Sequence, residues 1–275
     1  MTRKIISIFL ASAMILSVTA CGSNSTEESA DKSVSSSVES AETVAASEDS
    51  SESASAGTLV MATNAEFPPY EYHENDEIIG IDAEIAAAIA KELGYELEIE
   101  DIAFDSVIPE VTSGKADFGM AGMTVTEERK QNVNFSDTYA TARQSVIVKE
   151  NSDISSIDDL TGKIIGVQTG TTGDIYASDD YGDENIERYN KGMEAVQALS
   201  QGKVDAVIID NEPAKVYVSE NEGLKILDTA YAEEEYAICV ALDNTELLDK
   251  INTALAKLKN DGTIDEIVAK YIKSE

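Results

Sequence analysis

Two stretches of the chain repeat the same order of signals, and this repetition limits the fold more than any other feature of the sequence. Residues 111–120 read as the end of a helix, the tetrad Gly-Lys-Ala-Asp (114–117) and an apolar strand. Residues 199–208 read the same way around Gly-Lys-Val-Asp (202–205). Glycine ends a helix readily, and an apolar strand after it is typical of a buried strand in an α/β unit. The sequence therefore predicts an α/β protein with two lobes of similar design.

The alternation of strand and helix signals continues on both sides of these stretches. Residues 58–62 read as a strand, and Asp82 is placed to cap a helix over 83–93 whose apolar residues fall on one face. A further helix is expected from Asp105 or Ser106 to Gly114. Near the end of the chain, the pattern predicts two more helices, over 246–259 and 263–272.

Two extended runs without glycine or proline, 139–148 and 234–242, are the candidates for segments that cross between the lobes. If the chain crosses at both, the first lobe is built from two separate pieces. We expect residues 58–140 together with 237–275 to form lobe 1, and residues 141–236 to form lobe 2.

The N-terminus carries an export signal. Arg3 and Lys4 precede an apolar run that ends in Val-Thr-Ala-Cys at 18–21, which resembles the lipobox of bacterial lipoproteins. The resemblance implies that residues 1–20 are removed and that Cys21 receives a lipid. An uncleaved membrane anchor and an ordinary signal with a chance cysteine are the alternatives. Residues 21–57, rich in Ser and Glu and without aromatic residues, are expected to form a disordered tether.

Composition narrows the range of partners. The formal net charge is −33, so the surface repels the phosphates of nucleic acids and anionic lipids, and no nucleic-acid partner is expected. With Cys21 lipidated, Cys239 is the remaining cysteine and cannot form an internal disulfide. It lies in an apolar run and is expected to be buried.

Motifs for catalysis or metal binding are missing from the sequence. The one histidine, His73, lies in a polar segment and is expected to be a solvated loop residue. No Gly-x-Ser-x-Gly elbow, phosphate-binding Gly-Lys-Ser/Thr loop, zinc-type Cys/His cluster or calcium loop occurs. We therefore expect no cofactor, no metal and no enzymatic activity.

Three segments suit the binding of a small zwitterion. In residues 119–129, Arg129 follows the end of a strand, where open α/β sheets bind ligands, and it can clamp a carboxylate. Residues 166–174 run from a strand through a Thr/Gly turn into a helix start, which attracts an anion. Asp210, at the carboxyl end of a buried strand, can pair with an ammonium group.

Each segment also has a plainer interpretation. Arg129 alone could form a surface ion pair with Glu127 or Glu128. Thr171 or Thr172 could merely cap a helix, and Asp210 could cap the helix that follows it.

Taken together, the motifs resemble the family 3 solute-binding proteins, the amino-acid receptors of ABC importers. The resemblance rests on residues 62–72, 80–82, 119–129 and 134–137, which occur in the family's order. It covers residues 58–275. It implies the type II periplasmic-binding-protein fold, in which two α/β lobes joined by two crossing strands close on the ligand like a flytrap.

The resemblance also implies roles for individual residues. Arg129, helped by backbone amides at Thr124 and near Thr172, would bind the α-carboxylate, and Asp210 with the Gly122 carbonyl would bind the α-ammonium group. Phe67 and Phe104 would flank the ligand side chain, and Asn64, Glu66 and Gln168 would set selectivity. The predicted ligand-binding set is thus Arg129, Asp210, Thr124, Gly122, Thr172, Phe67, Phe104, Asn64, Glu66, Gln168 and Tyr70.

Glu66 and Gln168 favour a polar or cationic ligand side chain, as in glutamine, arginine or cystine, over an acidic one. The resemblance implies an extracytoplasmic monomer, anchored to the outer face of the bacterial membrane, that delivers an amino acid to an ABC permease and its ATPase. Two alternatives stay open. One is an enzyme of the cyclohexadienyl or arogenate dehydratase type with Glu66 as its acid or base, and the other is an amino-acid sensor module.

Overall fold

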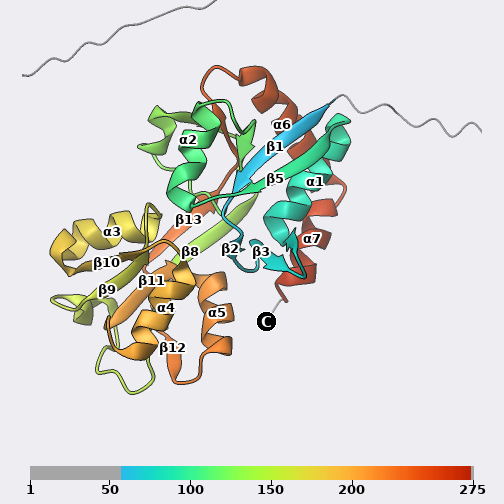
Figure 1. The fold of residues 1–275 in the computed structure, drawn as a ribbon. Helices are drawn as coiled ribbons and strands as arrows, with labels where there is room; N and C mark the ends of the chain where they lie inside the picture. Colours follow the sequence, from blue (N-terminus) through green and yellow to red (C-terminus); the bar gives the residue numbers. More distant parts are fainter. Residues whose placement is uncertain (1–56, 274–275) are drawn as a thin grey trace, which may run out of the picture. The chain divides into compact units, whose positions relative to one another are not determined.

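The computed structural model describes residues 57–273, which form two α/β lobes (Figure 1). The predicted signal peptide, the lipidation site Cys21 and the predicted tether up to residue 56 lie outside the described residues. Within the described part, no helix is both long enough and apolar enough to cross a membrane.

The sheet of lobe 1 has the strand order β5-β1-β6-β14-β7. Its first three strands are parallel, and β14 runs antiparallel to both of its neighbours. A small antiparallel sheet, β2-β3-β4, is attached to this lobe. The strands of lobe 1 are β1 (Thr58–Thr63), β2 (Glu66–Phe67), β3 (Glu71–Glu74), β4 (Glu77–Ile79), β5 (Glu96–Asp101), β6 (Phe118–Gly119), β7 (Val133–Phe135) and β14 (Cys239–Ala241).

Helices cover both faces of this sheet. Apolar side chains of α1 and of the C-terminal helices α6 and α7 pack on one face with Met61 and Phe118, whereas α2 packs on the other with Ala62 and Cys239. Cys239 is 0 % exposed in this core, as predicted, and its burial raises the pKa of the thiol to about 12. The helices are α1 (Ile81–Leu93), η1 (Phe104–Ser106), α2 (Val107–Thr112), η2 (Arg129–Gln131), α6 (Thr245–Asn260) and α7 (Thr263–Tyr271).

Lobe 2 repeats this design with the strand order β10-β9-β11-β8-β12, and β13 pairs with a further stretch of β8. Residues alternate along its strands: Val207 and Ile209 face α4 and α5, whereas Ala206 and Ile208 face α3. Its elements are β8 (Ala140–Lys149), η3 (Ile157–Leu160), β9 (Ile165–Gln168), α3 (Thr172–Tyr181), η4 (Asp183–Asn185), β10 (Ile186–Tyr189), α4 (Gly192–Gln201), β11 (Ala206–Asp210), α5 (Asn211–Glu220), β12 (Leu224–Ile226) and β13 (Ala232–Tyr236).

The two repeated tetrads have the same structural role in both lobes. Gly114 and Gly202 turn the chain with φ angles of 75° and 74°, in the left-handed region that glycine adopts readily. The aspartate of each tetrad then accepts a hydrogen bond from the backbone at the neighbouring parallel strand. Asp117 Oδ2 lies 2.8 Å from the amide nitrogen of Val60, and Asp205 Oδ2 lies 2.9 Å from that of Ile164. The two tetrads therefore attach the strand that follows them to its parallel neighbour in the same way. The prediction of two similar lobes is confirmed.

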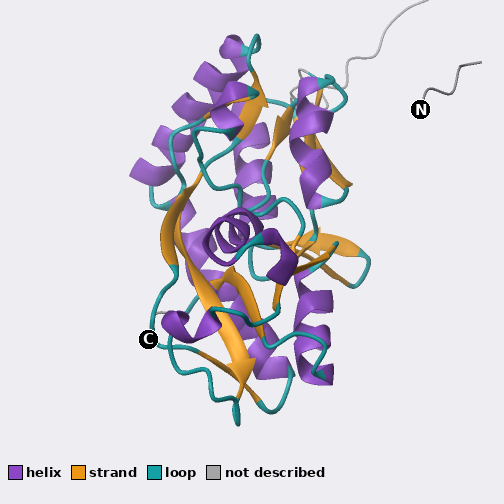
Figure 2. Ribbon diagram, turned by 90° about the vertical axis from the view of Figure 1, so that its left-hand side faces the viewer, coloured by secondary structure: helices purple, strands orange, loops and turns teal. Residues whose placement is uncertain are grey.

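Two neighbouring chain segments connect the lobes. The long strand β8 begins at Ala140 and pairs antiparallel with β13, which ends at Tyr236. The pairing continues beyond these strands, because the amide of Tyr139 donates to the carbonyl of Tyr236. Figure 2 shows the long strand running from the junction into lobe 2. We keep the predicted boundaries, 140/141 and 236/237, as our definition of the lobes.

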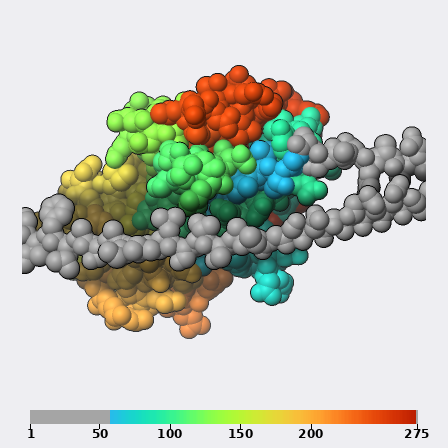
Figure 3. All heavy atoms as spheres, turned by 45° about the horizontal axis from the view of Figure 1, so that its top comes forward, coloured from blue at the N-terminus to red at the C-terminus, as the bar shows by residue number. Residues whose placement is uncertain are grey.

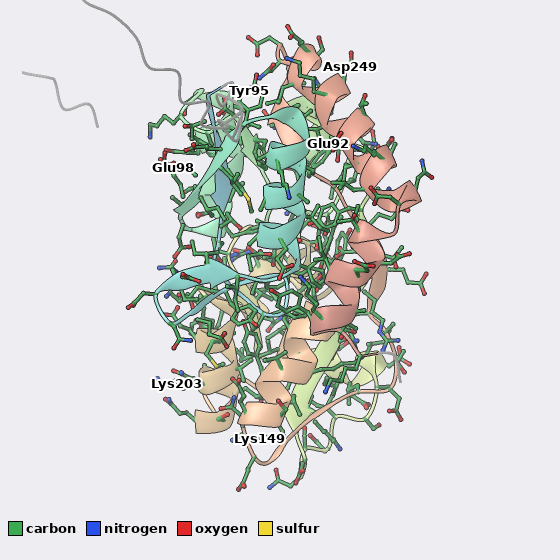
Figure 4. The ribbon with its side chains drawn as sticks, turned by 90° about the vertical axis from the view of Figure 1, so that its right-hand side faces the viewer. Glu92, Tyr95, Glu98, Lys149, Lys203 and Asp249 are labelled. Carbon is green, nitrogen blue, oxygen red and sulfur yellow. The ribbon has the colours of Figure 1, made fainter. Side chains whose placement is uncertain are left out.

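The space-filling view shows the segments of lobe 1, in blue, green and red, against those of lobe 2, in yellow and orange (Figure 3). In the side-chain view, Glu92 and Asp249 lie toward the far end of lobe 1, and Lys149 and Lys203 lie at the opposite end, in lobe 2 (Figure 4). These charged residues are far from the junction of the lobes.

Several sequence-based expectations need correction. Helix α1 begins at Ile81 rather than Ala83, and Gly80, not Asp82, is its cap residue. Gly80 has a φ of 124°, and a Cβ there would lie 2.2 Å from the carbonyl oxygen of Tyr70, so the close packing of this turn sets the helix start. His73 lies in β3 rather than in a loop, and its Nε2 lies 2.8 Å from Asp101 Oδ2. The helix expected from 105 or 106 to 114 is the shorter α2.

Candidate functional site

The site forms where the carboxyl ends of strands from both lobes meet. Asn64 follows β1 and Gly122 lies three residues after β6, both in lobe 1. Gln168 and Asp210 are the last residues of β9 and β11 in lobe 2. Because the two sheets share one strand order, these ends face the same junction, which is where open α/β sheets bind ligands.

One small cavity of about 10 Å³ brings most of the predicted residues together. That volume holds roughly one water molecule, so an amino acid enters only if the lobes separate or side chains move. Nine of the eleven predicted residues line this cavity, and Glu66 and Tyr70 are the two that do not. Its lining is Asn64, Phe67, Glu71, Phe104, Ala121, Gly122, Thr124, Arg129, Gln168, Thr171, Thr172 and Asp210.

Arg129 lies in the wall of this cavity and is only 7 % exposed. Its guanidinium donates to the carbonyl oxygens of Thr124 (2.7 Å) and Gly170 (3.1 Å), and its central carbon lies 5.4 Å from the centre of the Phe104 ring. Burial lowers the pKa of Arg129, although its usual value is so high that the group keeps its charge. Glu127 pairs with Lys130, and the guanidinium of Arg129 is bonded to carbonyl oxygens. The plainer interpretation of Arg129, a surface ion pair, is therefore wrong for this structure.

Asp210 is 6 % exposed and reaches the cavity from the opposite lobe. Its carboxylate accepts hydrogen bonds from Gln144 Nε2 (2.8 Å) and from the hydroxyl of Tyr236. Burial raises its pKa, and the nearby carboxylate of Glu234 raises it further. Asp210 occupies the cap position of α5 but makes no side-chain capping bond, so its carboxylate faces the cleft rather than the helix.

The Thr/Gly turn before α3 combines a cap with a cleft residue. Thr171 is the cap, because its hydroxyl accepts a hydrogen bond from the amide of Asp174 (3.2 Å). Thr172 is the first residue of α3, and its hydroxyl accepts from Gln144 Nε2 (3.2 Å). The plainer interpretation of this segment is therefore correct for Thr171, while both threonines line the cavity.

Direct contacts already join the lobes in this structure. Gln168 Nε2 donates to Asn64 Oδ1 (2.8 Å), and the contact from Arg129 to Gly170 also crosses the junction. Glu66 forms an ion pair with Lys191 of lobe 2, and its carbonyl accepts a hydrogen bond from the hydroxyl of Tyr217 (2.6 Å). The structure thus places Glu66 in a contact between the lobes, outside the cavity where a selectivity role was expected.

Tyr70 lines a neighbouring, larger cavity of about 880 Å³ beside the crossing segments. This second cavity shares Thr124 and Asp210 with the small one, so the two adjoin. The ring of Tyr70 meets that of Tyr236 edge-on, with 5.1 Å between the ring centres. Tyr70 therefore supports the wall of the site from outside.

Three buried polar residues at the site were not predicted from the sequence. The Gln144 side chain nitrogen lies within hydrogen-bond distance of Thr172, Asp210 and Glu234 and so connects three elements of lobe 2. Glu234 also accepts from the hydroxyl of Thr124 in lobe 1 (3.0 Å). Glu71 lies in the cavity wall itself. The available signal was the polar pair Gln144 and Ser145 directly before the apolar run 146–148 of β8.

Two lobes of the same strand order that enclose buried charges of opposite sign define the class of bilobal ligand-binding proteins. Within that class, comparison with known sequences identifies one family. Residues 59–274 match the family described as bacterial extracellular solute-binding proteins, family 3, and the chain belongs to this family. The extracytoplasmic location expected from the sequence fits it.

Named relatives agree with this assignment. The chain is 35% identical to the arginine-binding extracellular protein ArtP of Bacillus subtilis, over 99% of both chains. It is 35% identical to the glutamine-binding protein GlnH of the same organism, over 72% of this chain and 74% of GlnH. These relatives are amino-acid-binding proteins rather than enzymes, so the dehydratase alternative has no support from them.

Solved structures match in the same way. A mutant of ArgBP from T. maritima superimposes with a TM-score of 0.76 and 40% identity, covering 79% of this chain and 96% of that one. An ancestral arginine-binding protein bound to arginine matches with a TM-score of 0.74 and 44% identity, covering 78% and 98%. The same ancestral type bound to glutamine matches with a TM-score of 0.76 and 42% identity, covering 79% and 99%. The type II fold expected from the sequence is thereby confirmed.

Proposed function

We propose that this protein binds one free amino acid with a cationic side chain, arginine before others, and delivers it to an ABC permease. The observation that carries the proposal is the pair of buried, opposite charges in one cavity, Arg129 from lobe 1 and Asp210 from lobe 2. An α-amino acid presents the matching pair, a carboxylate and an ammonium group on one carbon. Each of its charges then satisfies a charge that is costly to bury alone.

In this proposal, Arg129 turns its two N–H arms from the carbonyls of Thr124 and Gly170 to the α-carboxylate. Asp210 and the carbonyl of Gly122 receive the α-ammonium group. Gly122 has a φ of 52°, and a Cβ there would come within 2.8 Å of the Phe67 ring, so only glycine leaves this carbonyl and ring in place. The two phenylalanines, Phe67 and Phe104, line the path of the ligand side chain.

The charge of the site favours a cationic side chain. Glu71, Asp82, Asp210 and Glu234 lie in or directly behind the cavity wall, and Arg129 is the cation among the residues that line it. A ligand with one net positive charge reduces this excess of buried carboxyl groups, whereas an acidic ligand increases it. The names of relatives such as ArtP and ArgBP support the same choice.

Ligand binding and lobe closure are coupled in this account. Because the closed cavity is too small for an amino acid, the ligand enters an open form and is then held by residues of both lobes. Contacts made only in the closed form give the ligand its differential affinity for that form. The paired segments at Tyr139 and Tyr236 are the place where the lobes can hinge.

Calorimetric titration of the purified full-length chain tests the proposal. The panel is arginine, lysine, histidine, glutamine, cystine and glutamate, and native mass spectrometry of the same preparation identifies any ligand that copurifies. We expect the tightest binding with arginine and none with glutamate. Tight binding of acidic amino acids alone would overturn the assignment.

The proposed setting in the cell is a monomer anchored through a lipid on Cys21. Labelling cells with a radioactive fatty acid should mark the wild-type chain and leave a Cys21→Ser variant unlabelled. The sensor alternative predicts that a strain without the partner permease still responds to the amino acid, whereas delivery to a permease predicts that deletion of this protein abolishes uptake of the amino acid.

A further inference from the structure

Asp174 is a buried carboxylate beside the site that has no place in the roles proposed above. It is the third residue of α3 and is 6 % exposed. It is not among the described residues that line the ligand cavity. A buried carboxylate is normally satisfied by hydrogen-bond donors, so the positions of its donors show which parts of the fold it holds together.

On the side of the site, Asp174 fixes the turn that precedes α3. Its Oδ2 accepts a hydrogen bond from the amide of Gly170 (3.0 Å), and its own amide donates to the hydroxyl of Thr171 (3.2 Å). That hydroxyl donates in turn to the carbonyl of Gln168 (2.8 Å). Gly170 has a φ of 77°, in the left-handed region. The turn 168–172 is therefore attached to the first turn of its helix through Asp174.

This turn takes part directly in the site. The carbonyl of Gly170 accepts a hydrogen bond from Arg129 across the junction of the lobes (3.1 Å). Gln168, Thr171 and Thr172 line the cavity. If Gly170 lost its bond to Asp174 and shifted, the carbonyl that orients Arg129 and the start of α3 would shift with it.

On the other side, Asp174 pairs with Arg188 in β10, the strand beside α3 (Figure 1). The Nε of Arg188 lies 2.8 Å from Oδ1 and 3.1 Å from Oδ2 of Asp174. Its Nη2 donates to the hydroxyl of Ser178 (2.8 Å) and to the carboxylate of Asp183 (2.6 Å). The hydrogen bonds to Asp174 and Asp183 raise the pKa of Arg188. The side chain of Arg188 is 35 % exposed and that of Asp174 is 9 % exposed, so the ion pair is partly shielded from solvent.

The charge of Asp174 matters because a second anion is expected at the same helix end. The N-terminus of a helix attracts anions, and the resemblance to the family places the α-carboxylate of the ligand near the amide of Thr172. Two carboxylates at one helix end repel each other unless a cation compensates one of them. Arg129 approaches from lobe 1 and serves the ligand. Arg188 is the cation that pairs with Asp174 within lobe 2.

We propose that Asp174 and Arg188 form a positioning pair for the α-carboxylate of the ligand. Asp174 holds the turn 168–172, and Arg188 offsets the charge of Asp174 so that the start of α3 stays attractive to an anion. The inference rests on the proposed function, in which the α-carboxylate is bound by Arg129. Neither residue of the pair touches the ligand. Because all α-amino acids present the same carboxylate, the pair strengthens the binding of each by the same factor and does not select among side chains.

Removing the charges one at a time tests the role of Arg188. Calorimetric titration of the full-length chain with arginine and with glutamine compares the wild type, Arg188→Ala, and Arg188→Ala combined with Asp174→Asn. Arg188→Ala should raise both dissociation constants about tenfold, because the charge of Asp174 is then uncompensated. Adding Asp174→Asn removes that charge and should return both constants to within about threefold of the wild type. A merely structural ion pair predicts the opposite, a double variant at least as weak as Arg188→Ala.

Two substitutions of Asp174 test its hold on the turn. Asp174→Asn keeps an oxygen that can accept from the amide of Gly170, so affinity should stay within about threefold of the wild type, whereas Asp174→Ala loses the acceptor and should weaken both ligands about tenfold. The matched control is Asp183→Asn, which removes the partner of Arg188 whose side chain is 78 % exposed and should leave both affinities unchanged. Circular dichroism melting curves show whether each variant is folded. Arg188→Gln replaces Arg188→Ala if the latter does not fold, and the Arg188 series decides alone if Asp174→Ala does not fold.

The outcomes separate the two proposals. If Arg188→Ala or a folded Asp174→Ala binds like the wild type, or if the double variant is as weak as Arg188→Ala, the positioning role is overturned and the proposed function stands. A loss for arginine without an equal loss for glutamine would also overturn it, because both ligands carry the same carboxylate. If glutamine does not bind to the wild type, the arginine series decides. If no amino acid binds to the wild type, the proposed function falls and this inference falls with it.

Discussion

Replacing Arg129 with alanine removes the guanidinium that, in our account, holds the α-carboxylate of the ligand. Its two arms already make short hydrogen bonds to carbonyl oxygens of both lobes, at 2.7 Å and 3.1 Å, so they are placed to grip a carboxylate with two parallel bonds. Truncating one member of a desolvated charge pair costs about 2–5 kcal/mol. The dissociation constant for arginine should therefore rise about 30- to 5000-fold.

Calorimetric titration of Arg129→Ala with arginine and with glutamine measures this loss, which should be similar for both ligands because both present the same carboxylate. Arg129→Lys keeps the charge but loses the fork of donors, so it should fall between alanine and the wild type. Lys130→Ala is the matched control, since Lys130 is half exposed and pairs with Glu127. Unchanged affinity in a folded Arg129→Ala variant would refute the assignment of the carboxylate site.

Three further perturbations follow from the geometry. Gly122→Ala places a Cβ 2.8 Å from the Phe67 ring at a φ of 52°, so affinity measured by calorimetry should fall at least tenfold and a normal affinity would contradict the placement of this loop. Lys191→Ala breaks an exposed ion pair with Glu66 that contributes about 1 kcal/mol or less to the contact between the lobes. Small-angle scattering in low salt should therefore show a larger fraction of molecules with the lobes apart. In high salt the difference from the wild type should vanish, because salt screens the pair. Burial raises the pKa of Asp82 from 3.8 to about 6, so the stability that it contributes in acid is lost as the pH rises through this window. Relative to Asp82→Asn, the free energy of unfolding of the unliganded wild type, measured in urea, should therefore fall by about 2 kcal/mol between pH 4 and pH 6. A difference that does not change with pH would refute the shift.

The sequence was sufficient for the parts of the fold that local signals encode. The repeated glycine and aspartate of the two tetrads identified two α/β units because each tetrad both ends a helix and attaches the next strand to its parallel neighbour. Asp210 was also predictable from its place at the end of a buried strand, because carboxyl ends of parallel strands collect at one edge. Asn64 and Gln168 were expected from the resemblance to the family. Their shared cavity follows from the like topology of the two sheets.

Features that depend on distant partners were missed. Glu66 reads as a free acid in the sequence, but its partner Lys191 lies 125 residues further along the chain. Asp82 has the chemistry of a helix cap, yet the packing of Gly80 against Tyr70 moves the helix start and leaves the Asp82 carboxyl buried under the cleft. Such side chains take their roles from tertiary contacts, which no local pattern contains.

The most direct measurement of the central claim is a crystal structure of this chain with arginine. The account predicts one arginine between the lobes, with its α-carboxylate about 3 Å from the guanidinium of Arg129 and its α-ammonium group at a similar distance from Asp210. Arginine bound elsewhere, or bound between the lobes with these two side chains turned away from it, would contradict the account.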